Sequence, residues 1–460
     1  MSKSEKRLEI GPVAFLIAGL MFMEFLDASI LPTAAPTIAR DFHVFSDQIG
    51  ICVTTYMAAL VVLIPVSAWL AEKYGVRRIL FAGITIFIIG SMLCALCTDL
   101  NELTFMRIVQ GVGAATMVPV GRLILMRSVV RTEVIRVIAY SVWPALVAPV
   151  VAPILGGFII AHASWHWIFL INLPIGVVAL VIGFKIVPDI PGGKLEKLDW
   201  RGFYGSAFSL GFLVFGAAAL GAPHINTLIT IVLLALAFGI GWPTIRYMKL
   251  RHVPLVDFSP LQIQTFQLNS ISGFLYRIAQ NTAPFALPLL FQDKFGWSAE
   301  RSGEILFFYM FGNLGFKIFT TPLMRKFRFK TLILICTVVS IPMAIMMGIM
   351  NSSLALPWMA MLLIISGSIR SLGMTLYNTI TFADIDQEIM SHANTLANMI
   401  QQLSSVFAVA FAVIAINVGR AILGASGQFI IVFSLAAVML LLSLRKVIEL
   451  PRDAGDSLRS

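Results

Sequence analysis

The sequence predicts an all-α integral membrane protein. Hydrophobic residues make up 58% of the 460 residues, charged residues make up 12%, and the mean hydropathy is +0.91. Soluble domains are about half apolar and about a quarter charged, so this balance excludes a soluble globular fold. The apolar residues also form unbroken runs of about 18 residues or more, the length that an α-helix needs to cross a bilayer.

Fourteen such runs follow one another along the chain, too long and too continuous for the strands of a membrane barrel. The even number of crossings places both ends of the chain on the same side. The predicted spans are residues 10–39, 48–71, 78–98, 103–126, 134–161, 166–187, 202–221, 226–245, 265–291, 302–324, 331–350, 355–376, 394–418 and 427–444.

The formal charge of +10 gives the orientation of these spans. Lys and Arg cluster in alternate connections and in both tails, whereas the other connections carry little beyond Arg40, Lys294, Arg301 and Arg420. Basic connections stay on the cytoplasmic side, so we expect both termini in the cytoplasm and infer no nucleic-acid partner. The first span is far longer than a signal-peptide core and lacks a small-residue cleavage site, so we expect it to be retained.

The two halves of the chain repeat each other. The stretch SAWLAEKYGVRRIL at 67–80 matches TTPLMRKFRFKTLI at 320–333, with one basic cluster over the other. Six spans thus repeat as six, an organisation typical of secondary transporters that bind substrate between their halves. The predicted organisation is an N-terminal six-helix bundle at 1–190, a linker with two additional spans at 191–253, and a C-terminal six-helix bundle at 254–460.

Two carboxylates, Glu24 and Asp27, lie in the middle of the first span. An ionisable side chain at bilayer depth costs at least about 2.5–3.5 kcal/mol, so it is kept where it faces a cavity or a partner. Three residues apart on a helix, the two acids lie about 60° apart on one face. We therefore expect one of them to exchange a proton; the alternative is a structural carboxylate held by an arginine.

Five cations are also predicted at bilayer depth, and they outnumber these acids. A space between the halves would then be net positive, which favours an anionic, zwitterionic or carboxylate-bearing substrate, and we expect the two acids to face cations across this space. Alternatively, some cations pair with the acids or with helix ends. The candidate substrate-binding residues are Arg277, Gln280, Asn281, Lys317, Arg370 and Arg122, and the fifth cation is Arg107.

No arrangement typical of an enzyme or a metal site is present. The six histidines do not cluster, and Cys94 and Cys97 lie in a membrane span without neighbouring ligands, so packing is their expected role. No phosphate-binding loop of the P-loop type occurs, which favours an ion gradient over ATP as the energy source. Paired carboxylates beside arginine favour protons over sodium. We expect no enzymatic activity and no cofactor.

Three stretches resemble motifs of the major facilitator superfamily, specifically of the drug:proton antiporter family with fourteen spans. LDASILPTAAP at 26–36 resembles the first-helix motif L-D-x-T-I-V-N-x-A-L-P and keeps its acid as Asp27. AWLAEKYGVRR at 68–78 is similar to the loop signature G-x-L-A-D-R-x-G-R-R, with Glu72 in place of the Asp. RIVQGVGAA at 107–115 is similar to the fourth-helix motif R-x-x-Q-G-x-G-A-A.

Two further stretches carry the same resemblance. PALVAPVVAPILGG at 144–157 resembles the antiporter motif G-P-x-x-G-P-x-x-G-G of the fifth helix, although alanines replace two of its glycines. Prolines and glycines in a span allow kinks and close contacts against which the other half can pivot. SWHWIFLINLPIG at 164–176 matches the start of the sixth helix.

The resemblance implies the major facilitator fold, with two six-helix bundles plus two inserted helices. It also implies a proton-coupled secondary transporter that exports small organic molecules or drugs across the bacterial cytoplasmic membrane by alternating access. Proton coupling would fall to Asp27, Glu24 and Arg107. The implied gating residues are Glu72, Arg77, Arg78, Pro149, Pro153, Gly156 and Gly157.

Two rival functions remain open. The first is export of a specific anionic metabolite, such as a polycarboxylate or a siderophore, which the excess of buried cations favours. The second is a membrane receptor or scaffold that transports nothing. The expected partners are a small-molecule substrate, protons and membrane lipids, and we expect the protein to be a monomer.

Overall fold

The computed structural model describes residues 10–128, 134–188, 198–220, 227–251, 254–386, 389–451 and 454–455. Over these ranges the elements are helices and no strand occurs, which confirms the predicted all-α fold. Eleven helices in the described ranges are long and apolar enough to cross a membrane. The count of fourteen spans therefore stays a prediction.

The first bundle contains seven α-helices and one 3₁₀ turn. The chain enters α3 through Gly75, whose φ of 96° lies in the left-handed region that side-chain-bearing residues avoid. The elements are α1 (Ile10–Asp41), η1 (Ser46–Ile49), α2 (Gly50–Tyr74), α3 (Val76–Ala95), α4 (Leu100–Ser128), α5 (Val134–His162), α6 (Trp167–Leu170) and α7 (Asn172–Ile186).

Two helices follow the first bundle, and the second bundle follows them. Its last helix contains Gly424, whose φ of 72° breaks the helical path where two helices meet. The elements are α8 (Trp200–Leu220), α9 (Thr227–Lys249), η2 (Ser259–Gln262), α10 (Gln264–Leu289), η3 (Leu290–Lys294), α11 (Ala299–Gly315), α12 (Lys317–Lys326), α13 (Phe329–Ile349), α14 (Leu356–Ile380) and α15 (Met390–Ile448).

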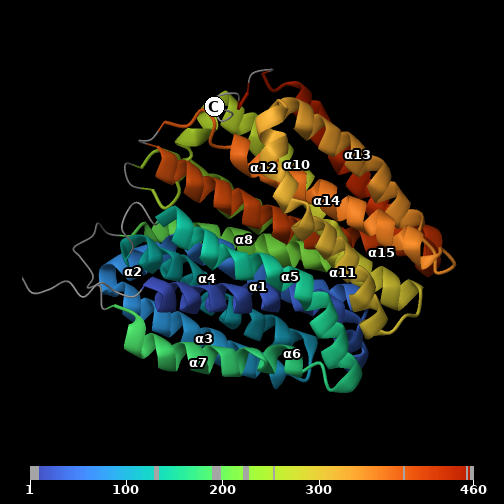
Figure 1. Ribbon diagram of the computed structural model, residues 1–460, viewed down its shortest axis with the longest axis horizontal. Coiled ribbons are helices and arrows are strands. Elements are labelled where there is room, and N and C mark those ends of the chain that lie inside the picture. The colour runs from blue at the N-terminus through green and yellow to red at the C-terminus, as the bar shows by residue number, and fades with distance from the viewer. Residues whose placement is uncertain are drawn as a thin grey trace, which may run out of the picture.

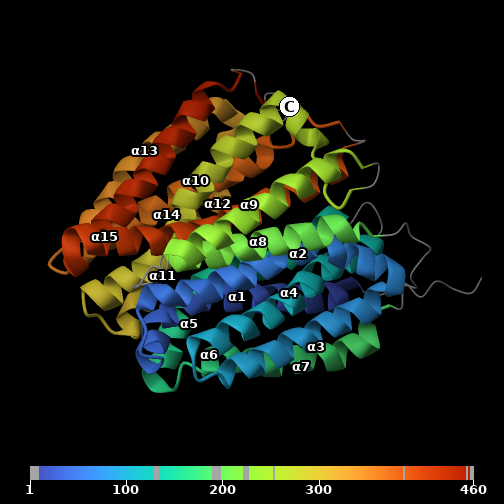
Figure 2. The ribbon, with the colours of Figure 1, turned by 180° about the vertical axis from the view of Figure 1, so that it is seen from behind.

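The helices form two groups that lie side by side (Figure 1). Helices α1 to α7 make up one bundle, and α10 to α15 make up the other. Helices α8 and α9 pack against each other, and α8 also contacts α2 and α15, so this pair lies along both bundles (Figure 2). The two extra helices therefore add to the contact between the bundles.

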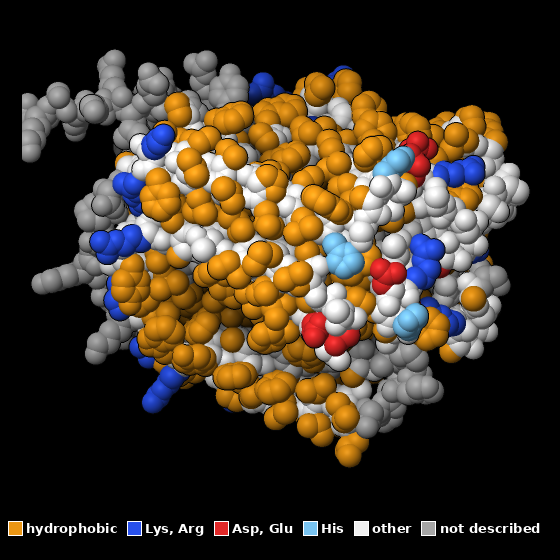
Figure 3. Space-filling model, turned by 90° about the horizontal axis from the view of Figure 1, so that it is seen from below, with side chains coloured by type: hydrophobic (Ala, Val, Ile, Leu, Met, Phe, Trp, Pro, Cys, Tyr) orange, Lys and Arg blue, Asp and Glu red, His pale blue; other side chains and the backbone are white. Residues whose placement is uncertain are grey.

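The two ends of the molecule differ in charge. Lys and Arg gather along one edge of the face in Figure 3, whereas Asp, Glu and His lie toward the other edge together with further Lys and Arg. Basic residues in the last turns of helices, such as Lys73, Lys326 and Lys446, lie at the first end. We call this end the basic end, and the end that carries η1 and η3 the opposite end.

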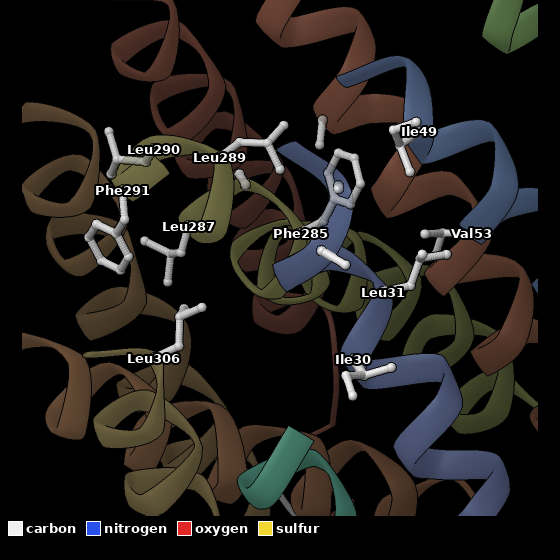
Figure 4. Packing of buried hydrophobic residues seen from close by; sticks show 14 of the residues in the cluster. Ile30, Leu31, Ile49, Val53, Phe285, Leu287, Leu289, Leu290, Phe291 and Leu306 are labelled. Carbon is white, nitrogen blue, oxygen red and sulfur yellow. The ribbon is translucent and has the colours of Figure 1, made fainter. Parts of the chain in front are cut away.

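A large apolar cluster joins the two bundles toward the opposite end (Figure 4). Ile30 and Leu31 of α1 belong to the same cluster as Phe285 of α10 and Leu306 of α11. Two other clusters stay within one bundle each, whereas a smaller one joins Val61 of α2 to Val406 of α15 beside α8. Shared burial of apolar side chains thus holds the bundles together at this end.

The backbones of α5 and α11 approach each other closely in this region. A Cβ atom on Gly303 of α11 would lie 2.1 Å from the carbonyl oxygen of Pro153 of α5, and one on Gly157 would lie 2.6 Å from that of Ala299. Neither backbone oxygen can move away without moving its helix. The closed contact between the bundles therefore needs glycine at these positions.

We expect Gly303→Ala to push the bundles apart at the opposite end. The added methyl group overlaps the Pro153 carbonyl oxygen, and overpacking of this kind costs roughly 1–3 kcal/mol. The measurement is the distance between spin labels on Asn101→Cys and Ser352→Cys, two exposed positions at this end in different bundles. The label pair should report a longer distance in Gly303→Ala.

Gly315→Ala is the matched control, because it lies on the same helix and its Cβ would meet nothing within 4 Å. Its distance distribution should equal that of the parent protein. Equal distributions for Gly303→Ala and the parent would contradict the close packing described here.

Candidate functional site

The centre of the first bundle holds a buried ion pair. Arg107 of α4 donates from Nη1 to Oδ2 of Asp27 of α1 over 2.6 Å. Asp27 is 2% exposed and Arg107 is fully buried. A charge in such surroundings is stable only when it is paired and hydrogen-bonded, so each residue requires the other.

Amide side chains surround this pair. Gln110 of α4 and Asn172 of α7 each donate an N–H to Oδ1 of Asp27 over 2.8 Å. Gln110 also accepts from Arg107 and donates to Ser91 of α3. The Asp27 carboxylate thus receives three hydrogen bonds, and α1, α4 and α7 meet at it, while α3 joins them through Ser91.

Arg107 also contacts an aromatic ring and a backbone oxygen, and one of its nitrogens has no partner in the part of the chain that the structure describes. Its guanidinium carbon lies 4.1 Å from the centre of the Tyr56 ring, and Nε donates to the backbone oxygen of Cys52 over 3.4 Å. Nη2 is buried without a hydrogen-bond partner among the described residues. Loss of the Asp27 charge would therefore leave a cation with few other partners.

Glu24 lies one turn from Asp27 on α1 and has a different environment. It is 8% exposed, and its Oε2 is buried without a hydrogen-bond partner in the described part of the chain. Arg122 of α4 is the cation that interacts with it electrostatically, and Arg122 is exposed. The two acids therefore share a helix but have separate partners.

The second bundle places three cations around α14. Arg277 of α10 donates to Asn378 over 2.8 Å, and Lys317 of α12 donates to Thr375 over 3.1 Å. Arg370 of α14 donates to Asn281 of α10 over 3.0 Å. We call Arg277, Lys317 and Arg370 the cation cluster.

Among the described residues, the hydrogen-bond partners of the cation cluster are all neutral. The Nε atoms of Arg277 and Arg370 are buried without hydrogen-bond partners, and Lys317 interacts electrostatically with Arg370. Gln280, which shares the Arg277 helix, donates instead to Ser340 of α13. The excess of positive charge predicted from the sequence is therefore localised in the second bundle.

We expected the two acids to face cations across a space between the halves, and the structure differs. Asp27 pairs with Arg107 inside the first bundle, and the cation cluster bonds to residues of the second. The cause is the position of Arg107 and Gln110, three residues apart on one face of α4, which brings both donors to Asp27.

The predicted gating residues lie in two places. Pro153 and Gly157 of α5 contact α11 of the other bundle, and Gly156 packs against Ile30 of α1. Glu72, Arg77 and Arg78 lie at the basic end, where Arg77 donates to the Phe184 backbone oxygen over 2.5 Å. Pro149 is a half-buried residue within α5.

The sequence patterns did not predict a polar cluster that lies at the opposite end. Asp47 of η1, which is 1% exposed, accepts from Arg420 over 2.6 Å and from Asn417 over 2.8 Å, both of α15. Ser46 donates to Asp293 of η3 over 3.0 Å. Ser46, Asp47 and Asp293 lie in short connecting elements of ordinary polarity, so only their contacts between the bundles mark them.

We expect Arg107→Gln to lower the free energy of unfolding by roughly 3–5 kcal/mol, because it leaves the Asp27 charge buried and unpaired. Thermal unfolding followed by tryptophan fluorescence in detergent measures this. Adding Asp27→Asn should restore part of the loss, since the remaining groups are neutral amides.

Arg40→Gln is the control, because this arginine of α1 is exposed and its hydrogen bonds among the described residues stay within its own helix. Its effect should stay within about 0.5 kcal/mol. Additive effects of Asp27→Asn and Arg107→Gln would show that the two residues do not depend on each other.

The fold has close counterparts among solved structures. A POT family transporter in complex with 5-aminolevulinic acid superposes with a TM-score of 0.70 at 16% identity, over 96% of each chain. A D-xylose-proton symporter superposes with a TM-score of 0.68 at 14% identity, over 97% of this chain and 99% of that one. At such identities the likeness shows the fold alone.

Relatives in sequence span nearly the whole chain. The transport protein HsrA of Haemophilus influenzae is 30% identical over 97% of both chains. An MdtD multidrug resistance protein of Salmonella dublin is 31% identical over 85% of this chain and 83% of its own. The family model described as Major Facilitator Superfamily matches residues 17–409. The chain therefore belongs to the major facilitator superfamily, as a multi-pass membrane transporter whose relatives include multidrug resistance proteins and which is not an enzyme.

Proposed function

We propose that the protein is a proton-coupled exporter of small organic molecules that works by alternating access. The observation that carries the proposal is the Asp27–Arg107 ion pair, buried at the centre of the first bundle. The names of the sequence relatives, which include multidrug resistance proteins, support export of drug-like molecules.

Protonation of Asp27 would change the charge balance of the first bundle. The neutral carboxyl group would no longer compensate Arg107, which would be left buried with only neutral partners among the described residues: Gln110, Tyr56 and the Cys52 carbonyl group. Such a cation is costly in a dry interior, so the helices that carry it favour a different arrangement. Because α1, α4 and α7 meet at this pair, one proton can bias the whole bundle.

Glu24 is the second proton-coupling residue of the proposal. Its buried, unpartnered oxygen lies near the Asp27 charge and toward exposed Arg122. Glu24 would accept the proton that leaves Asp27 and release it on the side where Arg122 is exposed. In this way it would modulate proton release.

The contacts between the bundles support one state of an alternating cycle. The apolar cluster and the α5–α11 contact close the opposite end. By the positive-inside rule the basic end is cytoplasmic, so the opposite end is external. In the other state the bundles would separate externally and close at the basic end, where Glu72, Arg77 and Arg78 lie. The proposed rigid units are residues 1–190 and 254–460, with 191–253 as the linker that carries α8 and α9.

Substrate binding is proposed at the face of the second bundle. Asn378 on α14 is exposed and Arg370 is half-buried, although both lie within a membrane helix. Polar side chains at such depth are expected to face water between the bundles rather than lipid. The proposed site is Arg277, Gln280, Asn281, Lys317 and Arg370, with Arg122 on the facing bundle. We propose a monomer in a bacterial cytoplasmic membrane.

We expect Asp27→Asn to abolish accumulation driven by a proton gradient. Proteoliposomes with an acidic lumen would be loaded from outside with radiolabelled tetraphenylphosphonium, chloramphenicol or citrate, and wild type should accumulate at least one of them. Asp27→Asn should lose accumulation at least about tenfold while it still exchanges internal for external label, because exchange needs no proton.

Glu304→Gln is the control, since Glu304 is an exposed acid of α11, and it should transport as wild type does. Wild-type accumulation by Asp27→Asn would overturn the proton role. A wild-type protein that moves none of the three compounds would favour a receptor or scaffold.

A second candidate function is export of an organic anion, and the cation cluster favours it. Three cations, whose partners among the described residues are neutral and which include two buried Nε atoms without a partner there, match the oxygens of a carboxylate better than a lipophilic cation. Two arginines can each bind a carboxylate through paired N–H groups.

We expect Arg370→Gln and Arg277→Gln each to weaken citrate binding at least about tenfold, because each removes a charge that binds the anion. Isothermal titration of the detergent-solubilised protein measures this. Arg246→Gln is the control, a cation in the last turn of α9 outside the cluster, and should leave binding unchanged. Equal loss of tetraphenylphosphonium binding would point to altered folding instead.

A further inference from the structure

The external end of the molecule carries a cluster of polar and charged side chains that joins the two bundles. We call Ser46, Asp47, Asp293, Asn417 and Arg420 the external cluster. Ser46 and Asp47 belong to η1 of the first bundle, and the other three belong to η3 and α15 of the second. The Ser46–Asp293 and Asp47–Arg420 contacts therefore break whenever the bundles separate at this end.

Within this cluster the two carboxylates are unequal. Asp47 is 1% exposed and has two donors, Arg420 and Asn417. Among the described residues Asp293 accepts a hydrogen bond from one donor, the Ser46 hydroxyl group, and its side chain still reaches solvent. Asp293 is thus the carboxylate that an external proton can reach and that has the least support for its charge.

The groups that face Asp293 come from every neighbouring element. Asp47 of η1 disfavours its charge, whereas Arg420 of α15 and Arg40 of α1 favour it, and Lys294 follows it on η3 but turns to the backbone oxygen of Met350. Partial burial of the carboxyl group is the main cause that raises the pKa of Asp293 to about 6. The nearby Asp47 charge also raises this pKa, and the hydrogen bond from Ser46 lowers it.

We propose that Asp293 is a second proton-binding site of the transport cycle, which holds the external end closed when it is protonated and lets it open when it is ionised. A proton from external water binds one carboxylate oxygen, and the other still accepts from Ser46. The neutral carboxyl group no longer repels Asp47, so the Asp47–Arg420 ion pair can remain in place. This inference extends the proposed alternating access, because it assigns a closing proton to a residue far from Asp27.

The direction of the pH dependence follows from proton linkage. In an externally open state Asp293 would be surrounded by water and titrate near the ordinary value of about 3.9. The closed state therefore binds the proton more tightly, so closure is favoured as the pH falls from about 6 to about 4 and not above that range. The ratio of closed to open protein should rise by about tenfold, and by at most about 100-fold, since the group is partly exposed.

The test is the distance between spin labels on Asn101→Cys and Ser352→Cys, measured in nanodiscs from pH 4.5 to 7.5 without substrate. The native cysteines in the described residues are buried. We expect the short-distance population of the parent to grow as the pH falls below about 6. Asp293→Asn should show the short distance at every pH, because its side chain is always neutral.

Two further variants keep the outcome clear. Asp293→Glu keeps a titratable group and should restore the pH dependence, whereas Glu300→Gln removes an exposed acid at the same end and should titrate like the parent. A pH response in Asp293→Asn equal to that of the parent would overturn the proposal, as would a parent without any response.

The experiment uses neither substrate nor gradient, so its failure is separate from that of the proposed function. Loss of gradient-driven transport in Asp27→Asn together with a pH-independent external distance would retain the exporter and remove the role of Asp293. A pH-dependent distance in a protein that transports nothing would do the reverse.

Discussion

The cost of an unpaired charge in a dry interior governs the structure of the first bundle. There Asp27 and Arg107 form an ion pair, and amide side chains of neighbouring helices donate to the Asp27 carboxylate. Removing the charge of either partner would leave the charge of the other buried and uncompensated. That dependence ties the positions of α1, α4 and α7 to a single protonation state, which is why the proposed mechanism is centred there.

The two bundles differ in how they treat charge. In the first, the acid and the base compensate each other, whereas in the second, Arg277 and Arg370 have only neutral partners among the described residues. The internal repeat therefore does not extend to chemistry. The proposed function follows this difference, with proton exchange in the first bundle and substrate binding at the second.

The contact between the bundles combines a part that does not depend on pH and a part that does. Apolar side chains and the glycines of α5 and α11 fit without charge, so their packing is insensitive to pH. Asp47, Asp293 and Arg420 add interactions whose strength depends on ionisation. Gln292 adds a neutral bond to the Thr33 backbone oxygen over 2.9 Å. The proposed closing proton acts only on the pH-dependent part, so a modest change in charge can shift the equilibrium between the closed and the open external end.

The sequence alone determined the membrane class, the helical fold and the family, because apolar runs and motif residues such as Asp27, Glu72 and Arg107 are local in the chain. It also identified Arg107 as one of the cations expected at bilayer depth. Which residues face Asp27 was decided by the tertiary structure, since Asn172 and Gln110 come from helices whose rotation no local pattern sets. The same holds for the external cluster: Asp47 and Arg420 are 373 positions apart, and only the docking of the bundles brings their charges to 2.6 Å.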